Sequence, residues 1–164
     1  MIIMRPLAED DFEKLFEAAS DPLIWEQHPN KDRYKREVFM NFFKGAMESG
    51  GAFLVIEKDT GEVIGSSRYY GYNEEESSVS VGYTFIARKY WGRNFNPSMK
   101  KLMLDHAFGS VGKIYFHIGK DNIRSQKAIL KLGAVKIAET DMKYFGEDVS
   151  RNFIYLMEKE NWDK

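Results

Sequence analysis

The sequence predicts an α+β fold, a single domain in which a mixed β-sheet is flanked by helices. Strand-like and helix-like segments are intermixed along the chain without strict alternation, which is typical of a mixed sheet covered by helices. The length of 164 residues suits one domain. No internal repeat, low-complexity tract or linker interrupts the chain, so we predict one domain over residues 1–164.

The N-terminal part is expected to contain one strand and two helices. A short apolar strand over residues 1–7 precedes a helix over 8–19, which has acidic residues at its start and one apolar face. A short irregular or helical piece begins at Asp21-Pro22. A second helix covers residues 34–49 and ends at two glycines.

The rest of the chain is expected to supply most of the sheet and two more helices. The expected strands cover residues 52–56, 63–72, 79–86, 113–118, 135–144 and 152–158, with turns at 58–61 and 146–148. The helix after strand 79–86 carries its apolar side chains at Met99, Leu102, Met103 and Ala107. A last helix, over residues 122–132, is capped by Asn122 and stopped by Gly133.

The composition excludes several classes of protein. The 24 basic and 25 acidic residues leave no global charge that would attract nucleic acid or an acidic membrane. Cysteine is absent, which excludes disulfides, thiolate metal sites and cysteine nucleophiles. No apolar run approaches the ~20 residues of a membrane span, and the N-terminus lacks a signal-peptide pattern. We therefore expect a soluble, cytoplasmic protein.

The connection from strand 79–86 to the next helix is predicted to bind an anion. Its residues, Arg88 to Arg93, are cationic and aromatic and include Gly92. A strand that turns sharply into a helix leaves free N–H groups and the positive end of the helix dipole at the turn. Phosphate is the usual ligand of such a turn, and the cations suit a pyrophosphate. An ordinary connection with solvated cations explains the same residues equally well.

Two motifs stand out, KYWGRN at 89–94 and NIRSQKAILKLGA at 122–134. At their mutual spacing they resemble motifs of the GNAT superfamily of acetyl-CoA-dependent N-acetyltransferases, and the resemblance in element order covers almost the whole chain. More narrowly, the chain is similar to the ribosomal-protein amino-terminal acetyltransferase branch, because Val81-Gly82-Tyr83 resembles that branch's Ile-Gly-Tyr-like step. The resemblance implies a twisted, mostly antiparallel sheet of six or seven strands with helices on both faces. Strands 79–86 and 113–118 would form its central, splayed parallel pair.

The resemblance also implies acetyl-CoA as the co-substrate. Backbone groups of the splayed strands would pair with its pantetheine amides, and the amides of residues 92–96 would hold its pyrophosphate. Asn94 stands where the branch has a second glycine; asparagine tolerates a left-handed backbone, but its side chain crowds the ligand more than glycine does. The implied cofactor-binding residues are Phe85, Ile86, Lys89, Trp91, Gly92, Arg93, Asn94, Phe95, Asn96, Asn122 and Ser125.

The implied chemistry is direct attack of an amine on the thioester, with no covalent enzyme intermediate. By resemblance, Ser125 stands near the leaving thiolate as a proton donor, whereas the tyrosine used by many other members falls at Ile129 and is absent. Ser125 is explained equally well as a first-turn serine that helps to satisfy helix N–H groups. Asn122 is better explained as a cap than as a catalyst. The attacking amine has an unperturbed pKa near ~10, so a base or a water relay helps it to lose its proton.

The sequence offers several candidates for the general base that deprotonates the acceptor amine. Ser80 stands where the branch often has a glutamate and is a catalytic candidate. The other candidates for the base are Glu74, Glu75, Glu76 and His117. His117 faces the cleft or the opposite side according to strand parity, and a lone histidine there is more often structural. His28 and His106 are weaker candidates for the base. Candidates for the wall of an acceptor site are Trp25, Tyr34, Tyr69, Tyr70 and Tyr72, although aromatic residues on such elements more often belong to a core.

Two functions remain open at this point. The first is an N-acetyltransferase that moves an acetyl group from acetyl-CoA to a primary amine of a small molecule or peptide. The alternative is a non-catalytic acyl-CoA-binding module, because the branch's glutamate and second glycine are both missing. The acceptor is a protein amino terminus, a polyamine, an amino acid or an antibiotic amine. The acids at 74–76 favour a cationic acceptor, and a solvated loop explains them as well.

The remaining expectations concern metals and partners. No histidine and carboxylate grouping has metal-ligand spacing, so no metal is expected. Nucleic acid and membrane are not expected as partners, and the protein is expected to be a monomer or a homodimer.

Overall fold

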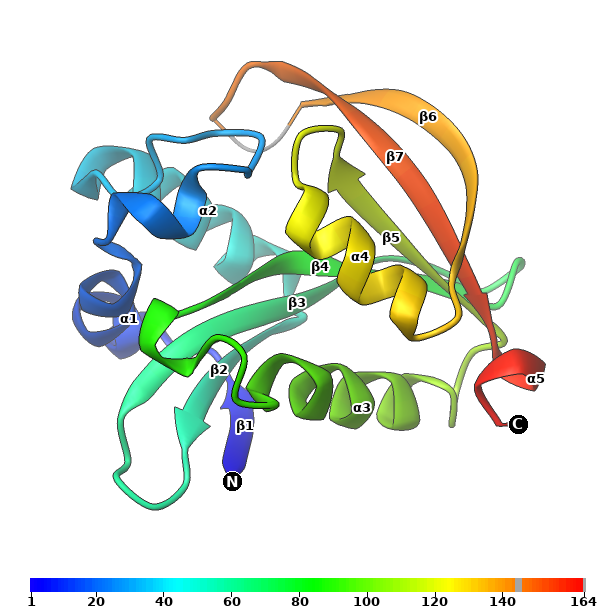
Figure 1. The fold of residues 1–164 in the computed structure, drawn as a ribbon, viewed down its shortest axis with the longest axis horizontal. Helices are drawn as coiled ribbons and strands as arrows, with labels where there is room; N and C mark the ends of the chain where they lie inside the picture. The colour runs from blue at the N-terminus through cyan, green and yellow to red at the C-terminus, as the bar shows by residue number, and fades with distance from the viewer. Residues whose placement is uncertain (144–145, 164) are drawn as a thin grey trace.

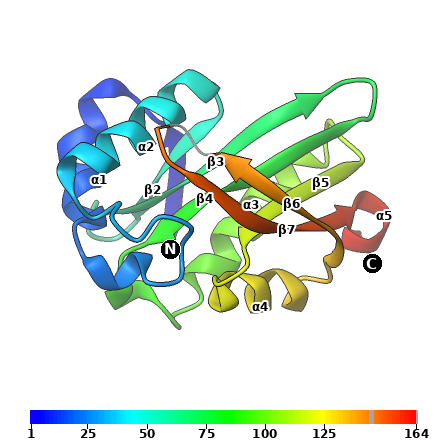
Figure 2. The same cartoon turned by 90° about the horizontal axis from the view of Figure 1, so that it is seen from above.

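The computed structural model of the chain describes residues 1–143 and 146–163. Within these residues, one seven-stranded sheet has the order β1-β2-β3-β4-β5-β7-β6 (Figures 1 and 2). All neighbouring strands are antiparallel except β4 and β5, which are parallel. The strands are β1 (Ile2–Pro6), β2 (Ala52–Glu57), β3 (Val63–Asn73), β4 (Ser78–Ile86), β5 (Lys113–Gly119), β6 (Val135–Lys143) and β7 (Val149–Glu158). The predicted mixed sheet with a central parallel pair is confirmed.

Helices cover both faces of the sheet (Figure 1). On one face, α1 (Phe12–Ala19) and α2 (Arg36–Ser49) bury a phenylalanine-rich cluster against Leu54 and Phe85. On the other face, α3 (Phe95–Ala107) and α4 (Ile123–Lys131) share a second cluster with the apolar residues of β4 and β5. The remaining short helices are Glu9–Asp11, Pro22–Trp25, Arg88–Tyr90 and α5 (Lys159–Trp162). None of the helices in the described ranges has both the length and the apolar character needed to cross a lipid bilayer.

Two element starts and one short helix differ from the prediction. The helix expected from residue 8 starts as a 3-10 turn, and α1 itself begins at Phe12. The Asp11 carboxylate causes this start, because it accepts hydrogen bonds from the Ala8 N–H at 2.8 Å and from the Arg5 guanidinium. β7 begins at Val149, earlier than predicted, and α5 was not predicted. The predicted end of β6, Tyr144, lies outside the described residues.

The buried face of α3 also differs from the prediction. Leu102 was assigned to the apolar face but is 48% exposed, whereas Lys100 is only 7% exposed. The residues that α3 buries beyond its first turn are Met99, Lys100, Met103, Leu104 and Ala107. These follow the same three- and four-residue steps as the predicted face, rotated so that a lysine takes an inward position.

The parallel pair separates after a short paired region. Ser78, Val79 and Ser80 of β4 pair with Lys113, Ile114 and Tyr115 of β5, and no later residues of the two strands pair with each other. β5 continues along β7 for its whole length. β4 stays with β3, but its register shifts between Gly82 and Phe85, and Tyr83 adopts φ +54° within this irregularity. The bend carries the second half of β4 away from β5, so the predicted splay is confirmed.

Candidate active site

A cavity of about 400 Å³ lies between the separated halves of β4 and β5. Its walls come from β4 from Val81 onward, from β5 from Phe116 onward, and from the inner sides of α3 and α4. The connection after β4 closes one end with Trp91, Gly92 and Asn94. The segment before α2 closes another side with His28, Pro29 and Arg33. The cavity therefore occupies the place at which the sequence predicted a ligand.

The connection from β4 to α3 has the shape of an anion-binding turn. Gly92 has φ +72° and Asn94 has φ +65° and ψ +12°, so both lie in the left-handed region. Asn94 thus adopts the left-handed backbone that a glycine at this position would adopt. The first hydrogen bond of α3 runs from the Ser98 N–H to the Asn94 carbonyl at 3.2 Å. The N–H groups of Phe95 and Asn96 consequently have no acceptor inside the helix and stand at its positive end.

The structure brings most of the predicted cofactor-binding residues to this cavity. Those that line it are Phe85, Ile86, Trp91, Gly92, Asn94, Asn96, Asn122 and Ser125. Three others do not line it. Lys89 is exposed and donates to Glu62 at 2.7 Å, Arg93 donates to the Lys89 carbonyl at 3.4 Å, and Phe95 is buried in the core against Tyr90. Lys89 and Arg93 are thus held by protein groups outside the cavity, and the third cation of the turn, Arg88, pairs with Asp21.

Trp91 connects the turn to both β4 and α4. Its indole N–H donates to the Ile86 carbonyl at 2.8 Å. The guanidinium of Arg124, at the start of α4, lies 4.0 Å from the centre of the Trp91 ring, within the range of a cation–π contact. Arg124 also lines the cavity, although it was not predicted as a site residue. Its position in the Asn-x-x-Ser motif was the available signal.

Ser125 and Asn122 lie where the resemblance implies. Both line the cavity, and Asn122 is 5% exposed. The Asn122 side-chain oxygen accepts the Ser125 N–H at 3.3 Å and so caps α4. Because asparagine makes the cap, the Ser125 hydroxyl is not needed for it. Ile129, at the position of the missing tyrosine, is buried and lines the same wall.

His117 faces the cavity from β5. Its Nδ1 atom is buried and has no hydrogen-bond partner among the described residues. Burial lowers the pKa of the His117 imidazole below its ordinary value of 6.5, so the ring is neutral at pH 7. A neutral imidazole with an unpaired nitrogen is equipped to accept a proton.

Ser80 and the acidic loop are not brought to the cavity. Ser80 is buried where β4 is still paired on both sides, with Tyr70 and with Tyr115, and it does not line the cavity. Glu74, Glu75 and Glu76 lie before β4, at the opposite end from the anion-binding turn. The Glu76 carboxylate accepts the Tyr115 hydroxyl. No carboxylate side chain of the described residues lines the cavity. Residues 74–76 are exposed, so of the two explanations offered for these acids the solvated loop fits the structure.

Some of the remaining predicted aromatic and histidine candidates line the cavity, and others do not. None of the five predicted aromatic residues is in the described cavity lining; Trp25 is fully buried in the core and Tyr72 is 64% exposed. The tyrosine of β4 that lines the cavity is Tyr83. His28 lines it as well, and burial, together with the charges of Arg33 and Arg124, lowers the pKa of its imidazole to about 3. His106 is exposed on α3 and does not line it.

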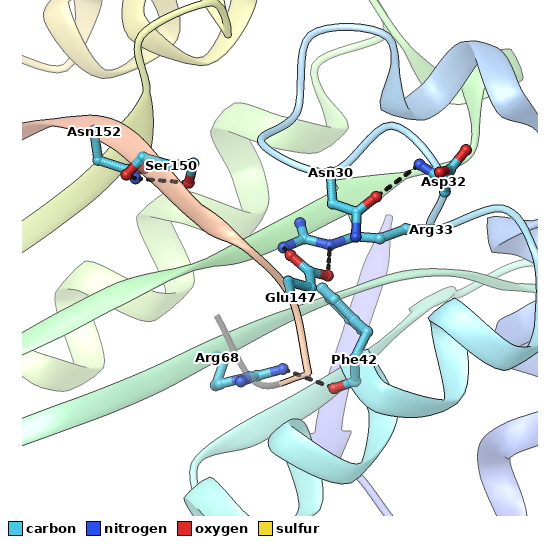
Figure 3. Close-up of polar contacts among 8 residues, drawn as sticks. All are labelled: Asn30, Asp32, Arg33, Phe42, Arg68, Glu147, Ser150 and Asn152. Atoms are coloured by element: carbon cyan, nitrogen blue, oxygen red, sulfur yellow. Dashed lines mark hydrogen bonds and ion pairs between the residues drawn. The ribbon is translucent and has the colours of Figure 1, made fainter. Parts of the chain in front are cut away.

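A buried ion pair closes the side of the cavity next to Tyr83. Arg33 donates to both carboxylate oxygens of Glu147 at 2.7 Å, from Nε and from Nη2, and both side chains are 3% exposed (Figure 3). Glu147 belongs to the turn between β6 and β7, which reaches toward the segment before α2 (Figure 1). Beneath this pair, Arg68 donates to the Phe42 carbonyl at 3.1 Å, and its guanidinium lies 3.7 Å from the centre of the Tyr83 ring. The surroundings of Tyr83 are therefore basic.

Lys100 is a cavity residue that the sequence prediction missed. It is buried on α3, and its Nζ atom donates to the Thr84 hydroxyl at 2.9 Å. Burial lowers the pKa of the Lys100 amine to about 8. The signal was present in the sequence, because Lys100 is spaced by three, four and seven residues from the buried Met103, Leu104 and Ala107.

No group of three or more His, Cys, Asp or Glu side chains in residues 1–143 and 146–163 is arranged to hold a metal ion. The polar groups that line the cavity are backbone amides, the side-chain amides of Asn94, Asn96 and Asn122, hydroxyls, imidazoles and cations. Such a set fits an anionic organic ligand with amide groups.

A sheet with a splayed parallel pair, a left-handed turn at a helix N-terminus and a cavity between them defines the acyl-CoA-dependent acetyltransferase class of folds. The chain belongs to the acetyltransferase (GNAT) domain family, whose model matches residues 1–135.

Individual acetyltransferases resemble the chain in sequence or in fold. The chain is 28% identical over 86 residues to an uncharacterised N-acetyltransferase, p20, of Bacillus licheniformis; the match covers 51% of the chain and 48% of that protein, so the chain spans about half the length of this curated relative. A GCN5-related N-acetyltransferase from Brucella melitensis has a similar fold, with a TM-score of 0.84 and 15% identity over 99% of this chain and 77% of that one.

A structure of spermidine N-acetyltransferase from Vibrio cholerae in complex with CoA and spermine is also similar. Its TM-score is 0.74 at 15% identity, over 99% of this chain and 98% of that one. These structural similarities establish the fold alone. The narrower resemblance to the ribosomal-protein branch stays a prediction.

Proposed function

We propose that the protein is an N-acetyltransferase that transfers the acetyl group of acetyl-CoA to a primary amine by direct attack. The observation that carries this proposal is the separation of β4 and β5 after Ser80 and Tyr115, which opens the cavity directly beside the left-handed turn. Backbone groups exposed by such a separation need partners when they are buried. A ligand that carries both amides and a diphosphate satisfies the strands and the turn together.

The donor substrate supplies an activated thioester, and the protein supplies its binding groups. The N–H groups at the start of α3 bind the diphosphate, in line with the dipole of the helix. Asn122, with its side chain held at the cap of α4, and the free edge of β4 bind the pantetheine amides. Arg124, stacked on Trp91, adds positive charge beside the phosphates.

The acyl-transfer end lies where the two strands converge. The neutral imidazole of His117 accepts a proton from the acceptor amine, directly or through water. The Ser125 hydroxyl hydrogen-bonds the departing sulfur, and N–H groups of β4 near Tyr83 stabilise the oxygen that becomes negative during attack. No residue of the protein forms a bond to the acetyl group.

The acceptor is proposed to be a small-molecule amine without extra positive charge. The described lining contains Lys100 and Arg124 and no carboxylate, and its third cation, Arg33, is paired with Glu147. A polycation such as spermine, the amine in the Vibrio cholerae complex, would meet repulsion here. An amine that also carries a carboxylate would be attracted.

The experiment is a thiol-release assay with acetyl-CoA and a panel of matched amines: an amino acid, its amide, a peptide with a free amino terminus, and spermidine. We expect turnover with at least one panel member and a preference for the amino acid over its amide and over spermidine. Preference for spermidine would contradict the proposed acceptor charge. A Ser125→Ala variant is expected to lower turnover by roughly tenfold and to leave CoA affinity nearly unchanged.

The alternative is an acyl-CoA-binding module without catalysis, favoured by the absence of a carboxylate base from the described cavity lining. It predicts CoA binding by calorimetry together with no thiol release above the rate of free acetyl-CoA for every amine tested. Saturable thiol release with any amine excludes it.

A further inference from the structure

Lys100 is a charged side chain buried in the proposed donor site, and no carboxylate of residues 1–143 and 146–163 forms an ion pair with it. Its Nζ atom donates to Thr84 Oγ1 at 2.9 Å, and Thr84 Oγ1 lies 2.8 Å from Ser67 Oγ. Both residues of this hydrogen-bonded chain, Thr84 and Ser67, carry neutral hydroxyls. An ammonium group taken out of water without a carboxylate costs free energy, so packing alone does not explain a lysine at this position. Buried charges that break the ordinary rules of a core are concentrated at functional sites.

The position of the ammonium group relates it to the two separated strands. Thr84 lies on β4 directly after the irregularity at Tyr83, in the part of the strand that no longer pairs with β5. On the other side, Lys100 Nζ lies 5.9 Å from the ring centre of Phe116, the first residue of β5 after its last pair with β4. Lys100 therefore reaches from α3 into the space between the separated part of β4, at Thr84, and the start of the separated part of β5, at Phe116.

The direction in which the proposed acetyl-CoA runs along β4 brings its thioester toward Lys100. This step rests on the proposed function, in which the diphosphate lies on the turn after β4 and the pantetheine arm runs back along β4. The thioester is at the far end of that arm and so lies where the strands converge. Ser125 and Ile129 line the cavity from α4, and Ile129 provides no proton.

We propose that Lys100 is a catalytic residue that donates a proton from Nζ to the departing sulfur of CoA. As the acceptor nitrogen bonds to the acetyl carbon, the carbon–sulfur bond breaks and its electron pair stays on sulfur. Lys100 transfers one proton to this thiolate and becomes a neutral amine. The acceptor nitrogen loses one proton to His117 or to water, and a proton from solvent restores the ammonium. The sum is an amide and a free thiol, with no other reactant.

The electrostatic surroundings suit this transfer. The pKa of the Lys100 amine, about 8, is close to the roughly 8.5 of an ordinary alkyl thiol, and matched values favour proton transfer. The shift comes from burial alone, with no contribution from a neighbouring charge. The other titratable or charged side chains that line the described cavity are His28 and Arg33 before α2, Tyr83 on β4, Tyr90 after β4, His117 on β5, and Arg124 on α4.

The test compares the binding of CoA with that of desulfo-CoA, which lacks the sulfur, by calorimetry across pH 6 to pH 10. In the wild type we expect CoA to bind roughly tenfold more tightly than desulfo-CoA where the bound thiol ionises, because an ammonium then faces a thiolate. The thiolate absorbance of bound CoA should titrate below that of free CoA. Lys100→Met should lose both the preference and the titration shift, while its affinity for desulfo-CoA stays the same.

Lys101→Met is the matched control, because Lys101 is the next residue on α3, is exposed, and pairs with Asp105. It should behave as the wild type. Equal losses of CoA and desulfo-CoA affinity in Lys100→Met would mean a structural role and overturn the proposal. Acetylation of Lys100 by acetyl-CoA alone, detected by mass spectrometry, would make it an acyl acceptor and overturn it as well. If the wild type binds neither ligand, it is the proposed function that fails.

Discussion

Arg33 and Glu147 form a bidentate, almost fully buried ion pair although 114 positions separate them in the sequence (Figure 3). The pair joins the segment before α2 to the turn between β6 and β7. Arg33 also lies 5.2 Å from the ring centre of Phe42 and lines the cavity. One interaction thus holds two distant parts of the chain at the acceptor side of the proposed site.

Removal of Glu147 is expected to destabilise the fold strongly. Glu147→Ala leaves the Arg33 charge buried without its carboxylate, and breaking a buried pair in this way costs about 3–5 kcal/mol. The measurement is the free energy of unfolding in urea. Arg33→Met combined with Glu147→Leu removes both charges and should recover most of the loss. A double variant no more stable than Glu147→Ala would show that the burial of an unpaired charge is not the cause.

Gly92→Glu is expected to abolish CoA binding. The new side chain would place a carboxylate and added bulk at the mouth of the anion-binding turn. We expect Kd for CoA to rise by at least roughly a hundredfold, equivalent to about 3 kcal/mol.

Gly61→Glu is the control, because Gly61 has a similar φ of +73° and equally open surroundings but lies in the turn between β2 and β3, away from the cavity. Both variants carry the same kind of backbone strain, so only the position differs. Equal CoA affinity of the two variants would refute the placement of the diphosphate.

His117 is expected to set the acidic limb of the pH–rate profile. Burial lowers the pKa of its imidazole below 6.5, so the ring stays neutral and basic until the pH falls below this lowered pKa. In the wild type, the acidic decline of kcat/KM should therefore begin only below pH 6.5. His117→Gln should remove this limb and lower the rate by roughly a hundredfold. An unchanged limb in the variant would assign it to another group.

Lys100→Met is expected to stabilise the protein at neutral pH. The Lys100 amine has a pKa near 10.5 in the unfolded chain and about 8 in the fold, so between these values the unfolded chain binds more protons. Stability contributed by this group therefore rises with pH across that window, and below pH 8 the full cost of the buried ammonium applies. Methionine removes a cost of roughly 3 kcal/mol, by the pKa difference.

The measurement is urea unfolding of wild type and variant at several pH values. The gain should be largest below pH 8 and should vanish above pH 10.5, and Lys101→Met should show no such dependence. A variant that is less stable than the wild type at pH 7 would contradict the unpaired burial of Lys100.

The sequence predicted most of the fold because its signals are local. Apolar periodicity, Asn122 at the start of α4 and Gly133 after it mark elements without reference to the rest of the chain. The splay of β4 and β5 was predicted by the resemblance to GNAT proteins, and its structural cause is the irregularity at Tyr83. Positive φ at a tyrosine has no reliable sequence signal.

The site was predicted best where a motif carries it. Gly92, Asn94, Asn122 and Ser125 stand in two short motifs, and all four line the cavity. The motif does not show which way a side chain points, so Lys89 and Arg93 were assigned to the ligand although they contact protein groups outside the cavity.

Long-range partners gave no signal at all. The Arg33–Glu147 pair depends on how the β6–β7 turn meets the segment before α2, and Lys100 was missed because charge was taken to mean exposure. The acidic residues 74–76 were placed near the cleft by sequence proximity to β4, but the strand carries them to its opposite end.

A crystal structure of the protein grown with CoA would test the placement of the donor most directly. We predict the diphosphate on the N–H groups of residues 92–96 and the pantetheine arm between β4 and β5, with its sulfur near Ser125 and Lys100. A structure with CoA bound elsewhere, or with the turn filled by the protein's own side chains at saturating CoA, would contradict it.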